Sequence, residues 1–191
     1  MRLWCATGNP GKLREFRLAA DRLDVELELL PGFRDLPPAV EDGETFEDNA
    51  VRKALHYARY AGERVFADDS GLEVDALAKA PGVRSARYSG EGATDESNNR
   101  LLLKNLRGVE DRTARFVCVI ALADGSQLLG AWRGSVEGRI LDAPRGSEGF
   151  GYDPLFYHPP FQCTFGEAAA ERKLLVSHRG KALRAMLQTL L

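Results

Sequence analysis

Long hydrophobic runs are missing from this sequence, because charged residues or glycines interrupt every candidate. None of them reaches the roughly 20 consecutive apolar residues that a membrane-spanning helix needs. The N-terminal stretch MRLWCATGN also lacks the long apolar segment of a secretory signal peptide. We therefore expect a soluble, cytoplasmic protein with no membrane partner.

Cysteine is scarce, and the three residues of this type lie far apart, at Cys5, Cys118 and Cys163. Their spacing matches no metal site, and an odd number argues against a disulfide framework. Both observations favour a reducing compartment.

An excess of positive charge is also missing, since 26 lysines and arginines face 28 acidic residues and the net charge is -2. Proteins that bind nucleic-acid duplexes usually carry a basic surface, so we expect no nucleic-acid partner. A small anionic molecule held by a few local bases remains compatible with this composition.

No covalent nucleophile stands out in the sequence. Ser70 lacks the G-x-S-x-G frame, and the cysteines have no activating neighbours. His56 falls on a helix face and His158 in a proline-rich segment, so neither indicates a catalytic triad.

Strand and helix patterns alternate along the chain. Strands are predicted at 2–6, 25–30 and 64–74, the last interrupted at its acids and Ser-Gly, and a hairpin joins 115–123 to 126–132 through Asp-Gly. Helices are predicted at 12–23, 45–62, 94–107 and 177–191, and loops at 82–92 and 144–154. We expect an α/β fold with a mixed sheet, in one domain spanning residues 1–191.

The stretch TGNPGK, residues 7 to 12, follows the first predicted strand and leads into a helix. Gly8 and Gly11 let the backbone approach a ligand closely, and the helix N-terminus and Lys12 both favour an anion. The spacing differs from a Walker loop, which has four residues between its glycines and a Ser or Thr after the lysine. A phosphate cradle and a plain turn with a surface lysine both remain open.

Two adjacent aspartates, Asp68 and Asp69, stand at the apolar end of a strand, where they are costly unless a cation, a donor network or water accompanies them. Neighbouring strand residues point to opposite faces, so the two carboxylates are expected to have different roles. Ser70 and Gly71 offer a hydroxyl and an N–H beside them. The alternative is an aspartate-capped turn.

Acidic residues also precede the helix that begins at Thr45, where TFED has the pattern of a capping box. Carboxylates from segments 41–42 and 68–69 together suit an octahedral Mg²⁺ that keeps some water and takes its other ligands from phosphate. Asn49 and Lys53 stand four residues apart on one face of the helix. Glu47 and Asp48 are interpreted as favouring the helix dipole only.

Two later motifs have the composition of a base-binding and anion-binding region. In GFGYDP, Phe150 and Tyr152 flank a glycine and can stack on a planar base, although a core plug is the alternative. In KLLVSHRGKA, cations crowd a helix N-terminus, where a ligand or a nearby acid must compensate for the dipole. Arg179 offers a planar fork for an oxo group or a phosphate.

Six motifs occur in order between residues 6 and 183: ATGNPGKLREF, ETFEDNAVRKA, ADDSGLEVDAL, PGVRSARYSG, GFGYDPLF and SHRGKAL. In this order and spelling, the chain closely resembles the inosine triphosphate pyrophosphatase family over nearly its whole length. The resemblance implies Mg²⁺-dependent hydrolysis of ITP, dITP and XTP to the monophosphate and pyrophosphate. It also implies an elongated mixed sheet, two lobes with an active-site cleft between them, and a homodimer.

The resemblance also implies roles for individual residues. Asp69 would bind the metal and accept a proton from the attacking water, Glu41 would be a second metal ligand, and Lys53 would face phosphate; whether Asp68 or Asp69 is the direct ligand stays open. The triphosphate would be held by Thr7, Gly8, Asn9, Pro10, Gly11 and Lys12. Ser70 would contact substrate, and the base would be bound by Phe150, Gly151, Tyr152, Asp153, Lys173, His178 and Arg179.

Two alternatives stand beside this interpretation. The septum-related nucleotide pyrophosphatases share the architecture but typically open with a Ser-Pro-Arg-Arg stretch, which is absent here. A nucleotide-binding sensor without catalysis has little need for a water-activating acid, so the carboxylates at 41 and 69 disfavour it.

Overall fold

The computed structural model describes residues 1–21, 23 and 25–190. The predicted helices 12–23 and 177–191 each include a position outside the described residues, namely Arg22 and Leu191. Within the described residues, no helix combines the length and apolar character needed to cross a membrane.

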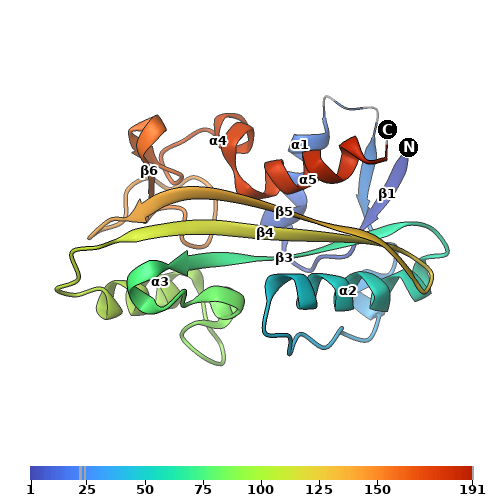
Figure 1. Ribbon diagram of the computed structural model, residues 1–191, viewed down its shortest axis with the longest axis horizontal. Helices are drawn as coiled ribbons and strands as arrows, with labels where there is room; N and C mark the ends of the chain where they lie inside the picture. The colour runs from blue at the N-terminus through green and yellow to red at the C-terminus, as the bar shows by residue number, and fades with distance from the viewer. Residues whose placement is uncertain (22, 24, 191) are drawn as a thin grey trace. The chain divides into compact units, whose positions relative to one another are not determined.

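The structure is built on a seven-stranded sheet with the order β2-β1-β3-β4-β5-β6-β7 (Figure 1). Strand β1 runs parallel to β2 and β3, whereas β6 pairs antiparallel with β5 and β7. The predicted α/β fold with a mixed sheet is therefore confirmed. The strands are β1 (Arg2–Cys5), β2 (Glu26–Leu29), β3 (Val65–Val74), β4 (Thr113–Asp124), β5 (Gln127–Ile140), β6 (Phe156–His158) and β7 (Cys163–Thr164).

Five α-helices accompany these strands in the described residues: α1 (Pro10–Ala20), α2 (Phe46–Ala61), α3 (Asp95–Asn105), α4 (Ala170–Val176) and α5 (His178–Gln188). The capping box predicted for α2 is present, since the Thr45 hydroxyl accepts from the Asp48 N–H and the Asp48 carboxylate accepts from the Thr45 N–H. The prediction of a loop over 82–92 was wrong in its first half, where Gly82–Arg87 forms a 3₁₀ helix.

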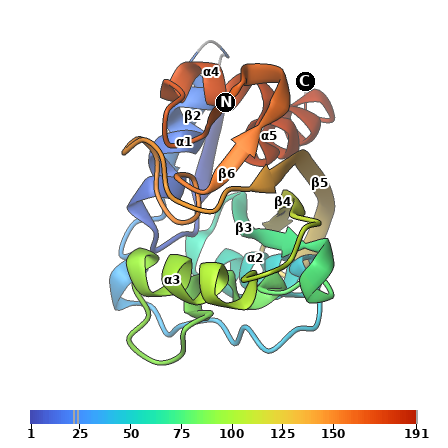
Figure 2. The ribbon, with the colours of Figure 1, turned by 90° about the vertical axis from the view of Figure 1, so that its left-hand side faces the viewer.

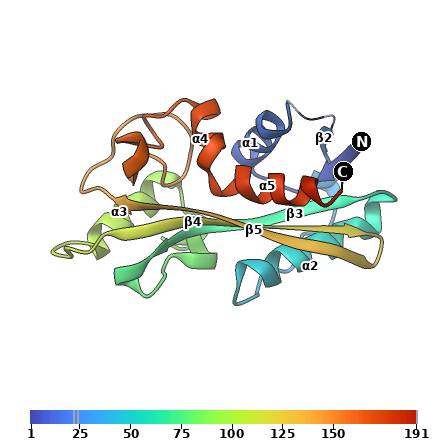
Figure 3. The same cartoon turned by 45° about the horizontal axis from the view of Figure 1, so that its top comes forward.

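The chain divides into two compact units. The first unit comprises residues 1–69, 118–134 and 178–191. In it, α1 and α5 cover one face of the strands and α2 the other (Figure 3). The side chains of Phe16, Phe66, Ile120 and Leu183 are fully buried in its core.

The second unit comprises residues 70–117 and 135–177. In it, α3 lies on one side of the strands and α4 lies on the other (Figure 2). Its core is aromatic, with Phe116 and Phe165 stacked at 6.1 Å between ring centres and Phe156 against both. This core fixes the end of the segment 144–154, which has neither helix nor strand, as the sequence predicts.

Strand β3 continues through the acids and Ser-Gly, so the predicted interruption was wrong. Gly71 suggests the end of a strand, but in the structure it is the point where the backbone of β3 comes close to residues 82 and 85. A Cβ there would lie 2.3 Å from the Ser85 Oγ and 2.6 Å from the Gly82 carbonyl oxygen. The aspartates stay in the strand because each one has a lysine beside it.

Candidate active site

The segment between β1 and α1 is organised by Asn9. Its side-chain oxygen accepts from the N–H groups of Gly11 and Lys12 at 2.9 and 3.1 Å, and the Thr7 hydroxyl accepts from the Asn9 N–H. With Pro10 at the first helical position, α1 begins two residues earlier than predicted. Because Asn9 already satisfies the N–H groups of Gly11 and Lys12, the attraction of this segment for an anion comes from the Lys12 ammonium and the helix dipole.

Asp68 is paired with Lys12. The Lys12 Nζ lies 2.9 Å from the Asp68 Oδ2, and only 1% of the Asp68 side chain is exposed. The Asp68 Oδ1 has no hydrogen-bond partner among the described residues. Burial works to raise the pKa of Asp68, but the charges of Lys12, Lys53 and Arg179 outweigh it and hold this pKa below its ordinary value.

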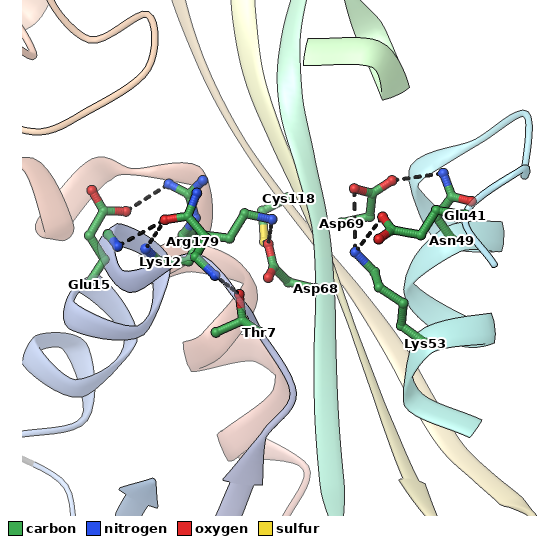
Figure 4. A network of polar contacts seen from close by, with 12 residues as sticks. Thr7, Lys12, Glu15, Glu41, Asn49, Lys53, Asp68, Asp69, Cys118 and Arg179 are labelled. Carbon is green, nitrogen blue, oxygen red and sulfur yellow. Dashed lines mark hydrogen bonds and ion pairs between the residues drawn. The ribbon is translucent and has the colours of Figure 1, made fainter. Parts of the chain in front are cut away.

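Asp69 projects from the opposite face of β3, towards α2, as the strand alternation predicts (Figure 4). The Asn49 Nδ2 donates to the Asp69 Oδ2 at 3.0 Å, and the Lys53 Nζ lies 3.7 Å from the Asp69 Oδ1. Asn49 and Lys53 therefore use their shared helix face to hold one carboxylate. Burial raises the pKa of Asp69 in spite of the lysines, which suits a proton acceptor.

Glu41 reaches the same place from the loop before α2. The Lys53 Nζ donates to the Glu41 Oε2 at 3.0 Å. The loop closes on the helix at Gly43, whose N–H donates to the Asn49 Oδ1, and a Cβ on Gly43 would lie 2.7 Å from that oxygen. Burial works to lower the pKa of Lys53, but Asp68, Asp69 and Glu41 together raise it, so the ammonium stays charged.

Two carboxylates from separate segments, Glu41 and Asp69, thus converge on one cation, the Lys53 ammonium. Their hard oxygen atoms are the ligands that Mg²⁺ prefers, and two carboxylates leave its other positions to water and phosphate. No cluster of three or more His, Cys, Asp or Glu side chains suited to a metal occurs in the described part of the chain. The donor set therefore fits a Mg²⁺ ion that phosphate helps to bind.

Arg179, the second residue of α5, is paired with Glu15 of α1. The Arg179 guanidinium donates to the Glu15 Oε2 at 2.8 Å, and 7% of each side chain is exposed. Of the two alternatives that the sequence leaves for a cation at this helix N-terminus, a ligand or a nearby acid, this pair provides the acid. Sequence reasoning did not name Glu15, although it is the only acid in PGKLREFRLAA. His178 is also buried, at 1% exposure.

The second unit holds another charged group. The Lys173 Nζ lies 2.5 Å from the Asp153 Oδ2, with 3% of each side chain exposed, and the Phe150 N–H donates to the same oxygen at 3.0 Å. The Lys173 Nζ also lies 5.5 Å from the centre of the Phe150 ring. Phe150, Asp153 and Lys173, which are predicted to bind the base, are therefore together in this unit.

Tyr152 differs from the stacking role that the sequence suggests. Its ring belongs to the aromatic core of the second unit, it is 5% exposed, and its hydroxyl donates to the Ser85 carbonyl oxygen at 2.7 Å. The alternative of a core plug describes this residue better. Phe150 is half-buried, and Ser70 follows Asp69 on β3 and is also half-buried.

Comparison with known proteins gives consistent matches over the whole chain. A sequence model of the Ham1 family matches residues 3–189. The dITP/XTP pyrophosphatase of Exiguobacterium sp. is 50% identical over 97% of this chain and 95% of its own, and that of Geobacter sulfurreducens is 51% identical over 95% and 92%. The solved Ham1 protein of Coxiella burnetii has a TM-score of 0.88 at 39% identity, covering 100% of this chain and 98% of the other.

Proposed function

Because this chain belongs to the Ham1 family, we propose that it hydrolyses non-canonical purine nucleoside triphosphates, namely ITP, dITP and XTP, to the nucleoside monophosphate and pyrophosphate. Family membership confirms the resemblance carried by the six motifs. The observation that carries the proposal is the cluster around Asp69, in which a buried carboxylate with a raised pKa stands beside a lysine and a second carboxylate. These are the groups that phosphoanhydride hydrolysis requires.

Each residue of the cluster has a distinct task. Asn49 fixes the Asp69 carboxylate through Oδ2, so that Oδ1 accepts the proton of the attacking water. The Lys53 ammonium neutralises negative charge on the phosphate that is attacked. The bond between the α- and β-phosphates breaks, its electron pair leaves with pyrophosphate, and the water oxygen remains on phosphorus.

The triphosphate also needs cations away from the water. The Lys12 ammonium has three N–H donors, of which one points to Asp68 at 2.9 Å. The others are available to phosphate oxygens, and the N-terminus of α1 adds its dipole. Thr7, Gly8 and Asn9 supply the close backbone approach that this arrangement needs.

Glu41 and Asp69 would hold Mg²⁺. When bound, the ion neutralises phosphate charge and favours the departure of pyrophosphate. Asp68 is the other carboxylate considered as a ligand, but it projects from the opposite face of β3 and pairs with Lys12. This geometry supports Asp69 as the direct ligand.

Incubation with dITP and Mg²⁺ tests the proposal directly. We expect pyrophosphate and dIMP in equal amounts, no orthophosphate, and much slower release from dATP. Chelation of Mg²⁺ with EDTA should stop the release, and added Mg²⁺ should restore it. Binding of dITP without any pyrophosphate would contradict the proposal and favour a nucleotide sensor.

The variant Asp68→Asn tests whether Asp68 is a partner of Lys12 or a metal ligand. We expect the KM for dITP to rise about tenfold, because a charge-assisted hydrogen bond that orients Lys12 contributes about 1.5–3 kcal/mol. The Mg²⁺ concentration for half-maximal activity should stay unchanged. Steady-state kinetics at varied dITP and varied Mg²⁺ give both values, and a large increase in the Mg²⁺ requirement would instead make Asp68 a ligand.

A homodimer is also proposed, and it rests on the family resemblance, as does the cytoplasmic location. Light scattering on the eluting protein gives the mass of the particle in solution. We expect about twice the 21.0 kDa of one chain.

A further inference from the structure

The loop that carries Phe150 has little rigidity of its own. Phe150 lies between Gly149 and Gly151, whose φ angles are +75° and +62°. Glycine adopts this conformation freely, but it also leaves it freely, because it has no Cβ to restrict the backbone. The orientation of the Phe150 ring must therefore be fixed by contacts from outside the two glycines.

Helix α3 supplies two of these contacts, and both are to the same residue. The Asp95 Oδ2 accepts from the Gly151 N–H at 2.7 Å, and the Asn99 Nδ2 donates to the Gly151 carbonyl oxygen at 3.0 Å. Asp95 and Asn99 are one helical turn apart, so their side chains stand on one face of α3. One acceptor and one donor thus hold both polar groups of the Gly151 backbone.

When the Asn99 Nδ2 donates to Gly151, the other polar atom of the same amide is left without a hydrogen bond. Its Oδ1 is buried and has no hydrogen-bond partner in the described part of the chain. A flipped amide would place two oxygen atoms against each other at the Gly151 carbonyl, so the donor must face the loop. Buried polar atoms normally form hydrogen bonds, so an unsatisfied acceptor is unusual. The hydrogen bond from the Asn99 Nδ2 to the Gly151 carbonyl oxygen explains why this orientation of the amide is kept.

The other residues of the loop are held by hydrogen bonds to Asp153, Lys173 and Ser85. The Asp153 carboxylate accepts from the Phe150 N–H and from Lys173, and the Tyr152 hydroxyl donates to Ser85. The contacts from α3 therefore complete a set in which residues 150 to 153 each have a partner. Asp95, Asn99 and Ser85 are the members of this set outside the predicted substrate contacts, and Asp95 and Asn99 are the two that contact Gly151.

We propose that Asp95 and Asn99 are positioning residues that hold the Gly151 peptide, and through it the Phe150 ring, in the orientation that binds the purine base. This inference rests on the proposed function. It assigns a specificity role to two side chains of α3, which act through their contacts with Gly151. Loss of either contact leaves the Asp69 cluster intact and so weakens base binding without slowing the chemical step.

Two isosteric substitutions with opposite expectations test the proposal. Asp95→Asn keeps an oxygen acceptor for the Gly151 N–H, so its KM for dITP should stay within about threefold of wild type. Asn99→Asp replaces the donor with an acceptor, so its KM should rise tenfold or more with kcat within about threefold, and its preference for dITP over dATP should fall. Asp95→Ala should resemble Asn99→Asp. Glu96→Gln is the matched control, since Glu96 shares the first turn but faces Arg100 and solvent.

The rate of amide hydrogen exchange at Gly151, measured by NMR, reports the hydrogen bond from the Gly151 N–H to Asp95 independently of enzyme activity. Exchange should be faster in Asp95→Ala and unchanged in Glu96→Gln. Faster exchange with an unchanged KM would overturn the positioning role and leave the proposed function standing. Unchanged exchange would overturn the contact itself. If the wild type binds dITP without hydrolysing it, the proposed function is wrong, and the dissociation constants of the same variants for dITP test the positioning role. If the wild type does not bind dITP, the proposed function and the positioning role are both wrong.

Discussion

Asp69→Asn is expected to lower the kcat of dITP hydrolysis by about a thousandfold, because general-base catalysis typically contributes 10²- to 10⁴-fold. The amide keeps the size of the carboxylate and still offers an oxygen to Asn49. It cannot accept a proton from water at neutral pH, and it removes one of the two negative charges beside Lys53. The loss therefore combines the base with the electrostatic environment of the site.

Single-turnover kinetics with saturating enzyme measure this loss separately from product release. Asp42→Asn is the matched control, since Asp42 neighbours Glu41 in the same acidic loop but pairs with Arg52 on the surface. We expect the control to keep its kcat within about twofold. Near-wild-type turnover by Asp69→Asn would remove Asp69 from the role of base.

Arg179→Ala is expected to lower the free energy of unfolding by about 3–5 kcal/mol, because it removes the guanidinium charge that pairs with the buried Glu15 carboxylate. Urea denaturation at neutral pH measures this loss. The double variant Glu15→Gln/Arg179→Met removes both charges and should recover most of the stability, since a buried pair often contributes little over neutral side chains of similar size. A single variant as stable as the wild type would show that the Arg179 charge is not needed to stabilise the Glu15 carboxylate.

The same two variants separate stability from base recognition. A donor from Arg179 suits the 6-oxo acceptor of hypoxanthine, whereas the 6-amino group of adenine would bring two donors together. Both variants should therefore lose much of the preference for ITP over ATP, although only one loses stability. If the double variant keeps the preference, a backbone N–H rather than Arg179 reads the purine at C6.

The sequence predicted those features that depend on neighbouring residues. The capping box at Thr45 was correct because both of its partners lie within one turn, and the opposite faces of Asp68 and Asp69 followed from strand alternation. The pairing of Glu15 with Arg179 was beyond local patterns, since 164 positions separate the two residues. The continuity of β3 was missed because its acids are stabilised by lysines from α1 and α2.

The contacts of α3 with Gly151 were missed for a related reason. Asp95 stands in the first turn of a helix, where an acid is expected for the helix dipole alone. Nothing nearby in the sequence indicates that its carboxylate receives an N–H from a residue 56 positions away. Only the folded backbone brings the two together.

The alternation of Asp68 and Asp69 along β3 also limits how the gene can change. Insertion of one codon between Val65 and Phe66 would exchange the faces of the two carboxylates, because side chains alternate with a period of two. Lys12 would then lose its pair with Asp68, and Lys53 would lose its pair with Asp69. The apolar side chain of Phe66 would also turn away from the core in which it is buried. The length of this short segment is therefore under stronger constraint than the identity of most of its residues.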